Sequence, residues 1–238
     1  MKIIITMAGQ GSRFTSKGFT NPKFKICTKG KTLYEWSMLS LSYFYNFTFI
    51  FIFFKGHQAK NFIEHKNQIL GIKNYLIIEI DSFTDGQATT VLKAQEIISN
   101  KEPILIYNID TYVNQSYLNP IDIEGNGWIP CFQAKGVQWS FLKFDGNYKV
   151  TDIVEKKRIS DYGTIGLYYF KSFELYKICY YEYYFPCVHK DTEKFIAPIY
   201  LKMIEQGLDI YTKILPSREV HVLGTPSDLK DFNLNFIV

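Results

Sequence analysis

Short apolar runs alternate along the first half of the chain with longer segments of helical spacing. The apolar runs are rich in β-branched residues and predict strands at residues 2–7, 48–54, 76–80 and 104–110. Apolar positions repeat at helical spacing in the segments between these runs, at residues 32–45, 58–70 and 87–99. Alternating strands and helices imply βαβ crossovers. We therefore predict an α/β fold with a mostly parallel central sheet and helices on both faces.

The pattern changes after about Trp128. Two β-type runs, residues 139–144 and 149–155, flank the turn Asp145-Gly146 and predict a small antiparallel hairpin. The remaining predicted elements are a strand at 165–170, helices at 173–183 and 193–206, strands near 210–215 and 220–223, and a last helix that begins around Pro226 with Thr225 as its cap. No linker or internal repeat interrupts the pattern, so residues 1–238 are expected to form a single domain.

Composition excludes several classes of protein. The chain is 47% hydrophobic and 21% charged, which rules out a disordered protein. A net charge of +4 is too small to indicate nucleic-acid binding, but it is compatible with phosphorylated small ligands. The uncharged stretch 36–54 is interrupted by serine, asparagine and threonine, so no membrane insertion is predicted.

The four cysteines, Cys27, Cys131, Cys179 and Cys187, form no Cys-x-x-Cys pair, which leaves zinc and thioredoxin-like chemistry without support. The N-terminal apolar run is too short for a signal segment and leads directly into a glycine loop. A cytoplasmic location is therefore expected.

The most informative motif follows the first predicted strand, in the segment MAGQGSRF at residues 7–14. Two glycines after a strand allow a sharp turn whose N–H groups can face an anion. Phe14 excludes the dinucleotide-binding fingerprint, and the absence of a following Gly-Lys-Ser/Thr excludes a P-loop. Arg13 and Lys23 add two cations beside the turn, a combination that suits a polyphosphate.

Asp110 ends the strand predicted at 104–110. Since ligands of such sheets bind at the carboxyl ends of the strands, its carboxylate is placed where Mg²⁺ would bridge protein and triphosphate.

The segment at 8–14 together with Pro22-Lys23 resembles the N-terminal signature of the sugar-1-phosphate nucleotidyltransferases. Four further segments extend the resemblance: Asp85-Gly86-Gln87-Ala88, Asn108-Ile109-Asp110, Val154-Glu155-Lys156 and residues 163–170. The resemblance implies a Rossmann-like nucleotidyltransferase domain that couples a nucleoside triphosphate to a phosphorylated small-molecule acceptor and releases pyrophosphate. Within the family, the chain looks most like the short enzymes of bacterial capsule and surface-glycan synthesis, which include cytidylyltransferases such as the CTP:phosphoglutamine enzyme.

The resemblance also implies roles for individual residues. The triphosphate would lie against Ala8, Gly9, Gln10, Gly11 and Ser12, with Arg13 and Lys23 as catalytic cations. The nucleobase would lie against Asp85, Gly86 and Gln87, and Asp110 would hold Mg²⁺. The acceptor would be bound by Glu155, Lys156, Gly163 and Thr164.

The chain departs from the family pattern at two points. The family usually has a second carboxylate two residues before a late Gly-Thr, and here Val222 occupies that position. Asp228 is the nearest carboxylate, but it lies on the other side of Gly224-Thr225. Lys157 follows Glu155-Lys156 where the family often has proline, and it is expected to extend the basic pocket toward a more acidic acceptor.

The leading hypothesis is direct nucleotidyl transfer, with CTP as the first choice of nucleotide. A phosphate monoester is a competent nucleophile near neutral pH, so the reaction needs positioning and charge stabilisation rather than a protein base. The alternatives are a UTP- or dTTP-dependent sugar-1-phosphate nucleotidyltransferase, a nucleotide-sugar-dependent glycosyltransferase and a non-catalytic nucleotide-sensing module. A homodimer remains open.

Overall fold

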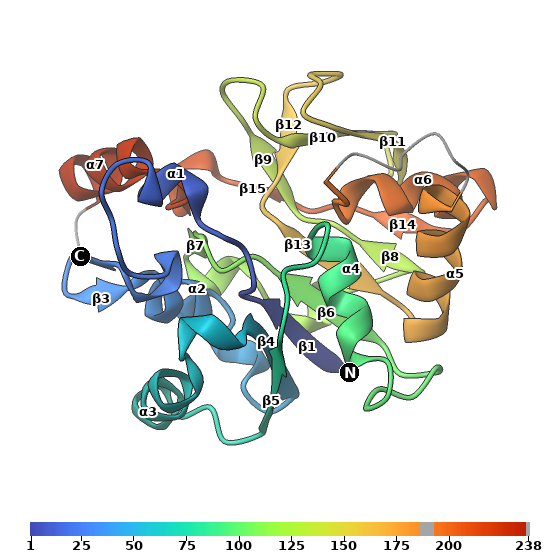
Figure 1. Cartoon of the computed structure of the whole chain (residues 1–238). Helices are drawn as coiled ribbons and strands as arrows, with labels where there is room; N and C mark the ends of the chain where they lie inside the picture. Colours follow the sequence, from blue (N-terminus) through green and yellow to red (C-terminus); the bar gives the residue numbers. More distant parts are fainter. Residues whose placement is uncertain (186–192, 237–238) are drawn as a thin grey trace.

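The computed structural model describes residues 1–185 and 193–236 (Figure 1). Among these residues the largest sheet has seven strands, in the order β14-β8-β13-β6-β1-β4-β5. Their bounds are β1 Lys2–Thr6, β4 Thr48–Phe54, β5 Tyr75–Ile80, β6 Ile104–Tyr107, β8 Gly127–Trp128, β13 Leu167–Phe170 and β14 Ile210–Tyr211. Neighbouring strands are parallel except at β13, which is antiparallel to both β6 and β8. The predicted α/β fold with a mostly parallel sheet is confirmed.

Both faces of this sheet are apolar, because its central strands consist of consecutive buried residues. On β1, Ile4 belongs to one buried cluster, while Ile3 and Ile5 belong to another on the opposite face. The first cluster includes residues of α4 (Gln87–Val91), α5 (Phe173–Tyr184) and α6 (Tyr200–Glu205), and the second includes residues of α2 (Leu33–Ser40) and α3 (Lys60–Leu70). Helices therefore cover both faces, as predicted for a doubly wound sheet.

A third cluster lies beside the main sheet. Phe14 of the short helix α1 (Ser12–Thr15) is buried here together with Trp36 of α2 and Phe232 of α7 (Pro226–Asn235). Thr225 caps α7 as predicted, since its hydroxyl accepts a hydrogen bond from the Asp228 backbone N–H. This cluster attaches the C-terminal helix to the first glycine loop.

The predicted hairpin is confirmed and belongs to a larger second sheet. Strand β10 (Ser140–Phe144) pairs with β11 (Val150–Glu155) in antiparallel register. The sheet continues in the order β11-β10-β12-β9-β15, with β9 Cys131–Gln133, β12 Tyr162–Thr164 and β15 Ile214–Leu215. Two small ladders complete the strands: β2 (Cys27–Thr28) with β3 (Lys31–Thr32), and β7 (Thr111–Val113) with β16 (Val220–Val222).

Three predicted helices are shorter than expected, and the one predicted at 32–45 ends at Ser40 before a 3-10 turn, Ser42–Phe44. The helix predicted at 87–99 ends at Val91 and continues as a 3-10 turn, Leu92–Ala94. The β-branched Thr90 lowers helix propensity at this point, and its hydroxyl bonds to the Gly86 carbonyl. The helix predicted at 193–206 begins only at Tyr200, because Pro198 lacks an N–H group and a 3-10 turn replaces the expected first turns.

The strand predicted near 210–215 is divided between the two sheets, because β14 pairs with β8 and β15 pairs with β9. Between them, Thr212 is buried and its hydroxyl donates to the Ile129 carbonyl oxygen at 2.7 Å. This crossing joins the second sheet to the first.

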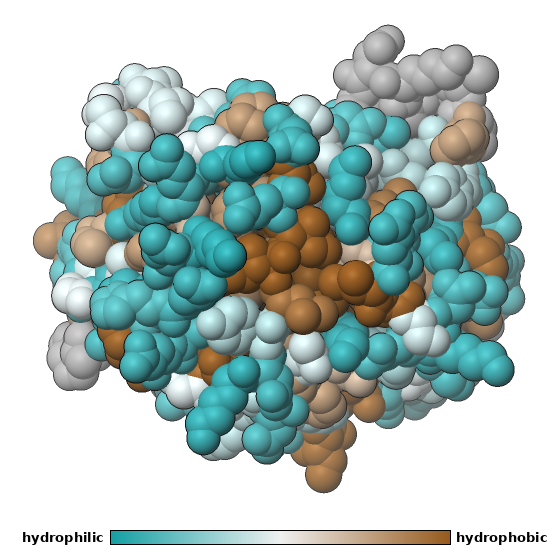
Figure 2. All heavy atoms as spheres, turned by 60° about the horizontal axis from the view of Figure 1, so that its bottom comes forward, coloured by the Kyte–Doolittle hydropathy of each residue, from teal (hydrophilic) through white to brown (hydrophobic). Residues whose placement is uncertain are grey.

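Cys27, Cys131 and Cys179 are free thiols, and Cys187 lies outside the described residues. Within residues 1–185 and 193–236, no helix is long and apolar enough to span a bilayer. Figure 2 shows hydrophobic residues gathered on part of one face and hydrophilic residues around them. Leu76 of the edge strand β5 is among the exposed large apolar residues, so the helices do not fully cover the apolar edge of the sheet.

Candidate active site

A cleft of about 600 Å³ opens at the carboxyl ends of the parallel strands. The predicted site residues that line it are Ala8, Gly9, Gln10, Gly11, Ser12, Arg13, Lys23, Asp85, Gly86, Gln87, Asp110, Glu155, Lys156 and Thr164. Strand β13 runs against its neighbours, and its first residue, Leu167, pairs with Tyr107 at the end of β6. The segment before β13 therefore reaches the same edge as the loops that follow β1, β5 and β6.

Two residues from the sequence analysis lie elsewhere. Gly163 is buried in β12, where a Cβ would lie 2.8 Å from the Ala134 side chain, so its small size serves packing between strands. Lys157 is exposed and is not among the residues that line the cleft. The expected extension of the basic pocket by Lys157 is therefore wrong, because residue 157 follows the end of β11 and is turned toward solvent.

The glycine loop presents open backbone to the cleft. A Cβ at Gly9 would meet no heavy atom within 4 Å, so a ligand can approach its backbone closely. Gly11 has a φ of +66°, a left-handed conformation that strongly favours glycine, and it precedes the first turn of α1. The loop can thus direct its N–H groups toward an anion, as the sequence predicted.

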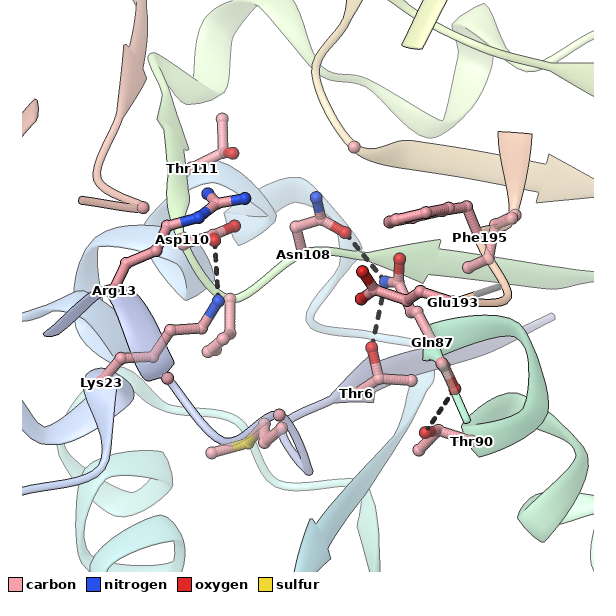
Figure 3. A pocket seen from close by; sticks show the side chains of 18 of the residues that line it. Thr6, Arg13, Lys23, Gln87, Thr90, Asn108, Asp110, Thr111, Glu193 and Phe195 are labelled. Atoms are coloured by element: carbon pink, nitrogen blue, oxygen red, sulfur yellow. Dashed lines mark hydrogen bonds and ion pairs between the residues drawn. The ribbon is translucent and has the colours of Figure 1, made fainter. Parts of the chain in front are cut away.

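The two predicted cations stand beside Asp110 (Figure 3). The Lys23 Nζ atom lies 2.7 Å from Asp110 Oδ2 in a partly buried ion pair. A Cβ on Gly224 would lie 3.1 Å from Asp110 Oδ2 and 3.9 Å from Arg13 Nη1, so all three residues meet at one end of the cleft. Arginine and lysine concentrated here form a site for negative charge.

Asp228 lines the same end of the cleft. Burial raises the pKa of its carboxyl group above the ordinary value, and the negative charge of Asp110 raises it further, against the opposing hydrogen bonds of Thr225 and the charge of Arg13. Sequence reasoning set Asp228 aside because of its position after Gly224-Thr225. The capping pattern was the missed signal, since a residue three positions after a cap points back toward it.

Val222 also lines the cleft, at the position where the family usually has a carboxylate. In the part of the chain that the structure describes, no three His, Cys, Asp or Glu side chains are grouped closely enough to hold a metal ion by themselves. Asp110 and Asp228 provide two carboxylates, which suits Mg²⁺, a cation that keeps several waters and takes few protein ligands.

Gln87 is fixed at the centre of the cleft (Figure 3). Its Nε2 atom donates to Thr6 Oγ1 at 3.0 Å and to Asn108 Oδ1 at 2.8 Å, and these residues stand at the carboxyl ends of β1 and β6. Both hydrogens of the amide nitrogen are therefore used within the protein. The amide oxygen remains available to accept a hydrogen bond from a ligand.

A connected group of polar side chains forms the opposite end of the cleft. Ser140 Oγ donates to the Glu155 carboxylate and lies 3.4 Å from the Tyr168 hydroxyl, which in turn lies 2.9 Å from Thr164 Oγ1. Burial raises the pKa of Glu155, although the Ser140 hydrogen bond and the charge of Lys156 favour its ionised form. This end thus carries a group of hydroxyl groups and one carboxylate that face the cleft.

Lys156 lies between two residues that the sequence analysis missed. Its Nζ atom is 4.0 Å from the centre of the Phe195 ring and 4.0 Å from Glu193 Oε2. Glu193 and Phe195 both line the cleft. The sequence predicts a helix here, but the backbone at these two residues is not helical, and it is held by tertiary pairing that local sequence does not reveal.

Several solved structures are similar to this chain. A nucleoside-diphosphate-sugar pyrophosphorylase from Vibrio cholerae RC9 is 34% identical, with a TM-score of 0.89 over 98% of this chain and 100% of that chain. The inositol-1-phosphate CTP transferase from T. maritima is 16% identical, with a TM-score of 0.75 over 95% of this chain and 90% of the other. CTP:phosphocholine cytidylyltransferase from Streptococcus pneumoniae is also 16% identical, with a TM-score of 0.72 over 98% and 97%.

The last two similarities show the fold alone. No protein-family model and no curated protein matches the chain, so the assignment rests on the solved structures. The identity of 34% extends over the full length of the pyrophosphorylase. The chain therefore belongs to the nucleotidyltransferase family, whose members join a nucleoside triphosphate to a phosphate ester and release pyrophosphate.

Proposed function

We propose that this protein transfers a cytidylyl group from CTP to a phosphorylated small-molecule acceptor in the synthesis of a capsule or surface-glycan precursor, in the cytoplasm. The acceptor is a phosphoglutamine-like compound or a sugar 1-phosphate, and residues 1–238 act as one nucleotidyltransferase domain. One observation carries the proposal: a single cleft joins the glycine loop, Arg13, Lys23 and Asp110 at one end to Glu155 and Lys156 at the other.

The reaction is an in-line displacement at the α-phosphorus. An oxygen of the acceptor phosphate forms the new P–O bond, and the bond to pyrophosphate breaks without a covalent enzyme intermediate. Backbone N–H groups of the glycine loop bind the triphosphate, and Arg13 stabilises the negative charge that grows on the leaving pyrophosphate. Lys23 binds near the α-phosphate, and Lys156 anchors the acceptor phosphate.

Asp110 and Asp228 would hold Mg²⁺ together with phosphate oxygens and water. The fit is supported by their hard oxygen ligands and by their place at the same end of the cleft, where the charge of Asp110 contributes, after burial, to the raised pKa of Asp228. When bound, the metal supplies further positive charge to the triphosphate. The protein's own contribution is to hold the two carboxylates on the side of the cleft that carries Arg13.

The geometry of Gln87 supports a nucleobase that presents a hydrogen-bond donor. Its amide nitrogen is engaged by Thr6 and Asn108, so only its oxygen remains to accept from a ligand such as the exocyclic amino group of cytosine. Two of the similar structures are CTP-dependent enzymes by their names.

A second candidate is a sugar-1-phosphate nucleotidyltransferase that uses UTP or dTTP. It is favoured by the 34% identity to a nucleoside-diphosphate-sugar pyrophosphorylase, and the N3–H group of uracil or thymine also offers a donor to Gln87. The family assignment argues against the other two alternatives, which are a glycosyltransferase that consumes a nucleotide sugar and a non-catalytic sensing module.

Pyrophosphate release tests the proposal directly. CTP, UTP, dTTP, GTP and ATP are each incubated with glutamine phosphate, sugar 1-phosphates and other phosphate monoesters in the presence of Mg²⁺. We expect pyrophosphate with CTP and one acceptor class, and the nucleotide-linked product is identified by mass spectrometry. Turnover of a sugar 1-phosphate with UTP or dTTP and none with CTP would establish the second candidate instead.

A further inference from the structure

We propose that Lys194 is a positioning residue that holds the nucleotide end and the acceptor end of the cleft in a fixed position relative to each other. The inference rests on the proposed function, because it assigns these two ends to the two substrates. Lys194 belongs to the segment 193–196, which runs along the cleft between the loop at 84–87 and Lys156.

The backbone of Lys194 is bound to the loop expected to hold the nucleobase. Its N–H group donates to the Asp85 carbonyl at 2.8 Å, and its own carbonyl accepts from the Ala88 N–H group at 3.0 Å. The two segments approach so closely that a Cβ at Gly86 would lie 2.3 Å from the Lys194 carbonyl oxygen and 2.4 Å from its nitrogen. Glycine at position 86 is thus required by this contact within the protein.

The side chain of Lys194 also bonds to this loop, through Asp85. Its Nζ atom lies 2.7 Å from Asp85 Oδ2, and Thr89 donates to the other carboxylate oxygen. Although burial acts in the opposite direction, the Lys194 and Thr89 hydrogen bonds hold the pKa of Asp85 below its ordinary value. Both oxygens of Asp85 are therefore engaged by the protein, and Asp85 acts by fixing the loop rather than through direct contact with the nucleotide.

Side chains of helix α5 contact Lys194, Thr89 and Phe195. The Lys194 Nζ atom lies 5.7 Å from the ring centres of both Tyr180 and Tyr184, and the Tyr180 hydroxyl lies 2.7 Å from Thr89 Oγ1. The Tyr184 hydroxyl donates to the Phe195 carbonyl at 2.6 Å. The segment is thus held against both the loop and the helix.

The residues on either side of Lys194 extend this arrangement to the acceptor end. Glu193 and Phe195 each lie 4.0 Å from Lys156, the residue proposed to bind the acceptor phosphate. Loosening Lys194 would therefore displace the nucleotide loop on one side and the surroundings of Lys156 on the other. A residue that only stabilised the fold would not weaken the binding of both substrates.

Lys194→Met tests the inference, because methionine keeps an apolar stem beside the tyrosine rings but removes the charge. We expect the KM for the nucleotide and the KM for the acceptor each to rise by about five- to tenfold, with kcat within about threefold of wild type. Lys194→Arg restores the ion pair and should restore both KM values. Calorimetry with the nucleotide alone should show the same rise in Kd.

Lys202→Met is a matched control, because Lys202 forms an equally short 2.7 Å pair with Glu205 on helix α6 and neither residue lines the cleft. It should leave both KM values unchanged. Gly86→Ala is a second variant, since its methyl group would push the Lys194 backbone away, and both KM values should again rise.

Active wild-type protein together with Lys194→Met KM values within twofold of wild type would overturn the inference, even if the melting temperature fell. Wild-type protein that releases no pyrophosphate with any substrate pair would instead contradict the proposed function. In that case the calorimetric Kd decides: an unchanged Kd in Lys194→Met rejects the positioning role, and no nucleotide binding by wild type rejects both.

Discussion

The side-chain ammonium of Lys23 forms a 2.7 Å ion pair with the carboxylate of Asp110 at one end of the cleft. Each is partly buried, and each satisfies the other in the absence of substrates. In the proposed reaction the two residues act on different partners, since Lys23 binds phosphate and Asp110 holds the metal. The existing pair lowers the cost of burying these two charges, and binding of a metal-bound nucleotide would exchange it for two new ion pairs.

Arg13→Met and Lys23→Met should each lower turnover by about 10²- to 10³-fold, the usual cost of removing one preorganised donor from a developing charge. Initial rates of pyrophosphate release measure the effect. Lys25→Met is the control, because Lys25 donates to backbone carbonyls of His57 and Gln58 and does not line the cleft. Turnover within threefold of wild type in both variants would contradict the assignment of Arg13 and Lys23.

Asp228→Asn should raise the Mg²⁺ concentration needed for half-maximal activity by about tenfold or more, since it removes a charged oxygen ligand. A magnesium titration at saturating nucleotide gives this concentration. Asp231→Asn changes an exposed aspartate on the same helix and should leave the titration unaltered. Identical titrations for Asp228→Asn and wild type would remove Asp228 from the proposed metal site.

Gly9→Ala should weaken nucleotide binding without changing the stability of the fold. A Cβ at Gly9 would meet no protein atom within 4 Å, so the melting temperature should stay at the wild-type value. The added methyl group would nevertheless occupy space that the phosphates need, and the KM for the nucleotide should rise on the order of tenfold. Gly146→Ala, in the hairpin turn and equally free of nearby atoms, should change neither quantity. A normal nucleotide KM in Gly9→Ala would place the triphosphate elsewhere.

Glu155→Gln should change how stability depends on pH. Burial raises the pKa of Glu155 above the ordinary value of 4.5, so the folded protein holds this proton more tightly than the unfolded chain does. Below the ordinary pKa, the protonated carboxyl contributes its full stabilisation of the folded protein. This contribution is lost as pH rises through the raised pKa of the folded protein. The melting temperature of Glu155→Gln relative to wild type should therefore increase as pH rises from the ordinary value of 4.5 toward neutrality.

Differential scanning fluorimetry across this pH range provides the measurement. Glu96→Gln, at an exposed position, should show the same pH dependence as wild type. A Glu155→Gln curve parallel to the wild-type curve would contradict the prediction.

Local patterns were enough to place the glycine loop, Arg13 and Asp110 at the cleft, where we propose that the nucleotide binds. The run of buried isoleucines in β1 followed by Gly9 and Gly11 determines both a strand and the turn after it, so Arg13 could be placed without the structure. Asp110 could be placed for the same reason, since it lies three residues after the buried strand β6. In both cases the chemistry lies within a few residues of the element that positions it.

The acceptor end depends on contacts between distant segments. Glu193 and Phe195 reach the cleft because Lys194 pairs with Asp85, more than a hundred residues earlier in the chain. No local periodicity carries that information, and the sequence predicted a helix there instead. Asp228 was missed because its approach to Asp110 depends on the packing of α7 against Phe14 and Trp36.

The chain leaves the first sheet after β8, forms strands β9 to β12 of the second sheet, and returns to the first sheet at β13. The points of departure and return are neighbours, since Trp128 at the end of β8 pairs with Tyr169 of β13. An excursion whose entrance and exit stand side by side can change length or sequence as long as the β8–β13 register and the pairing of β9 with β15 are kept. The residues proposed to bind the acceptor, Glu155, Lys156 and Thr164, lie on this excursion, whereas the glycine loop after β1 does not. Exchanging the segment between related enzymes is accordingly a direct way to give one nucleotide-activating core a new acceptor.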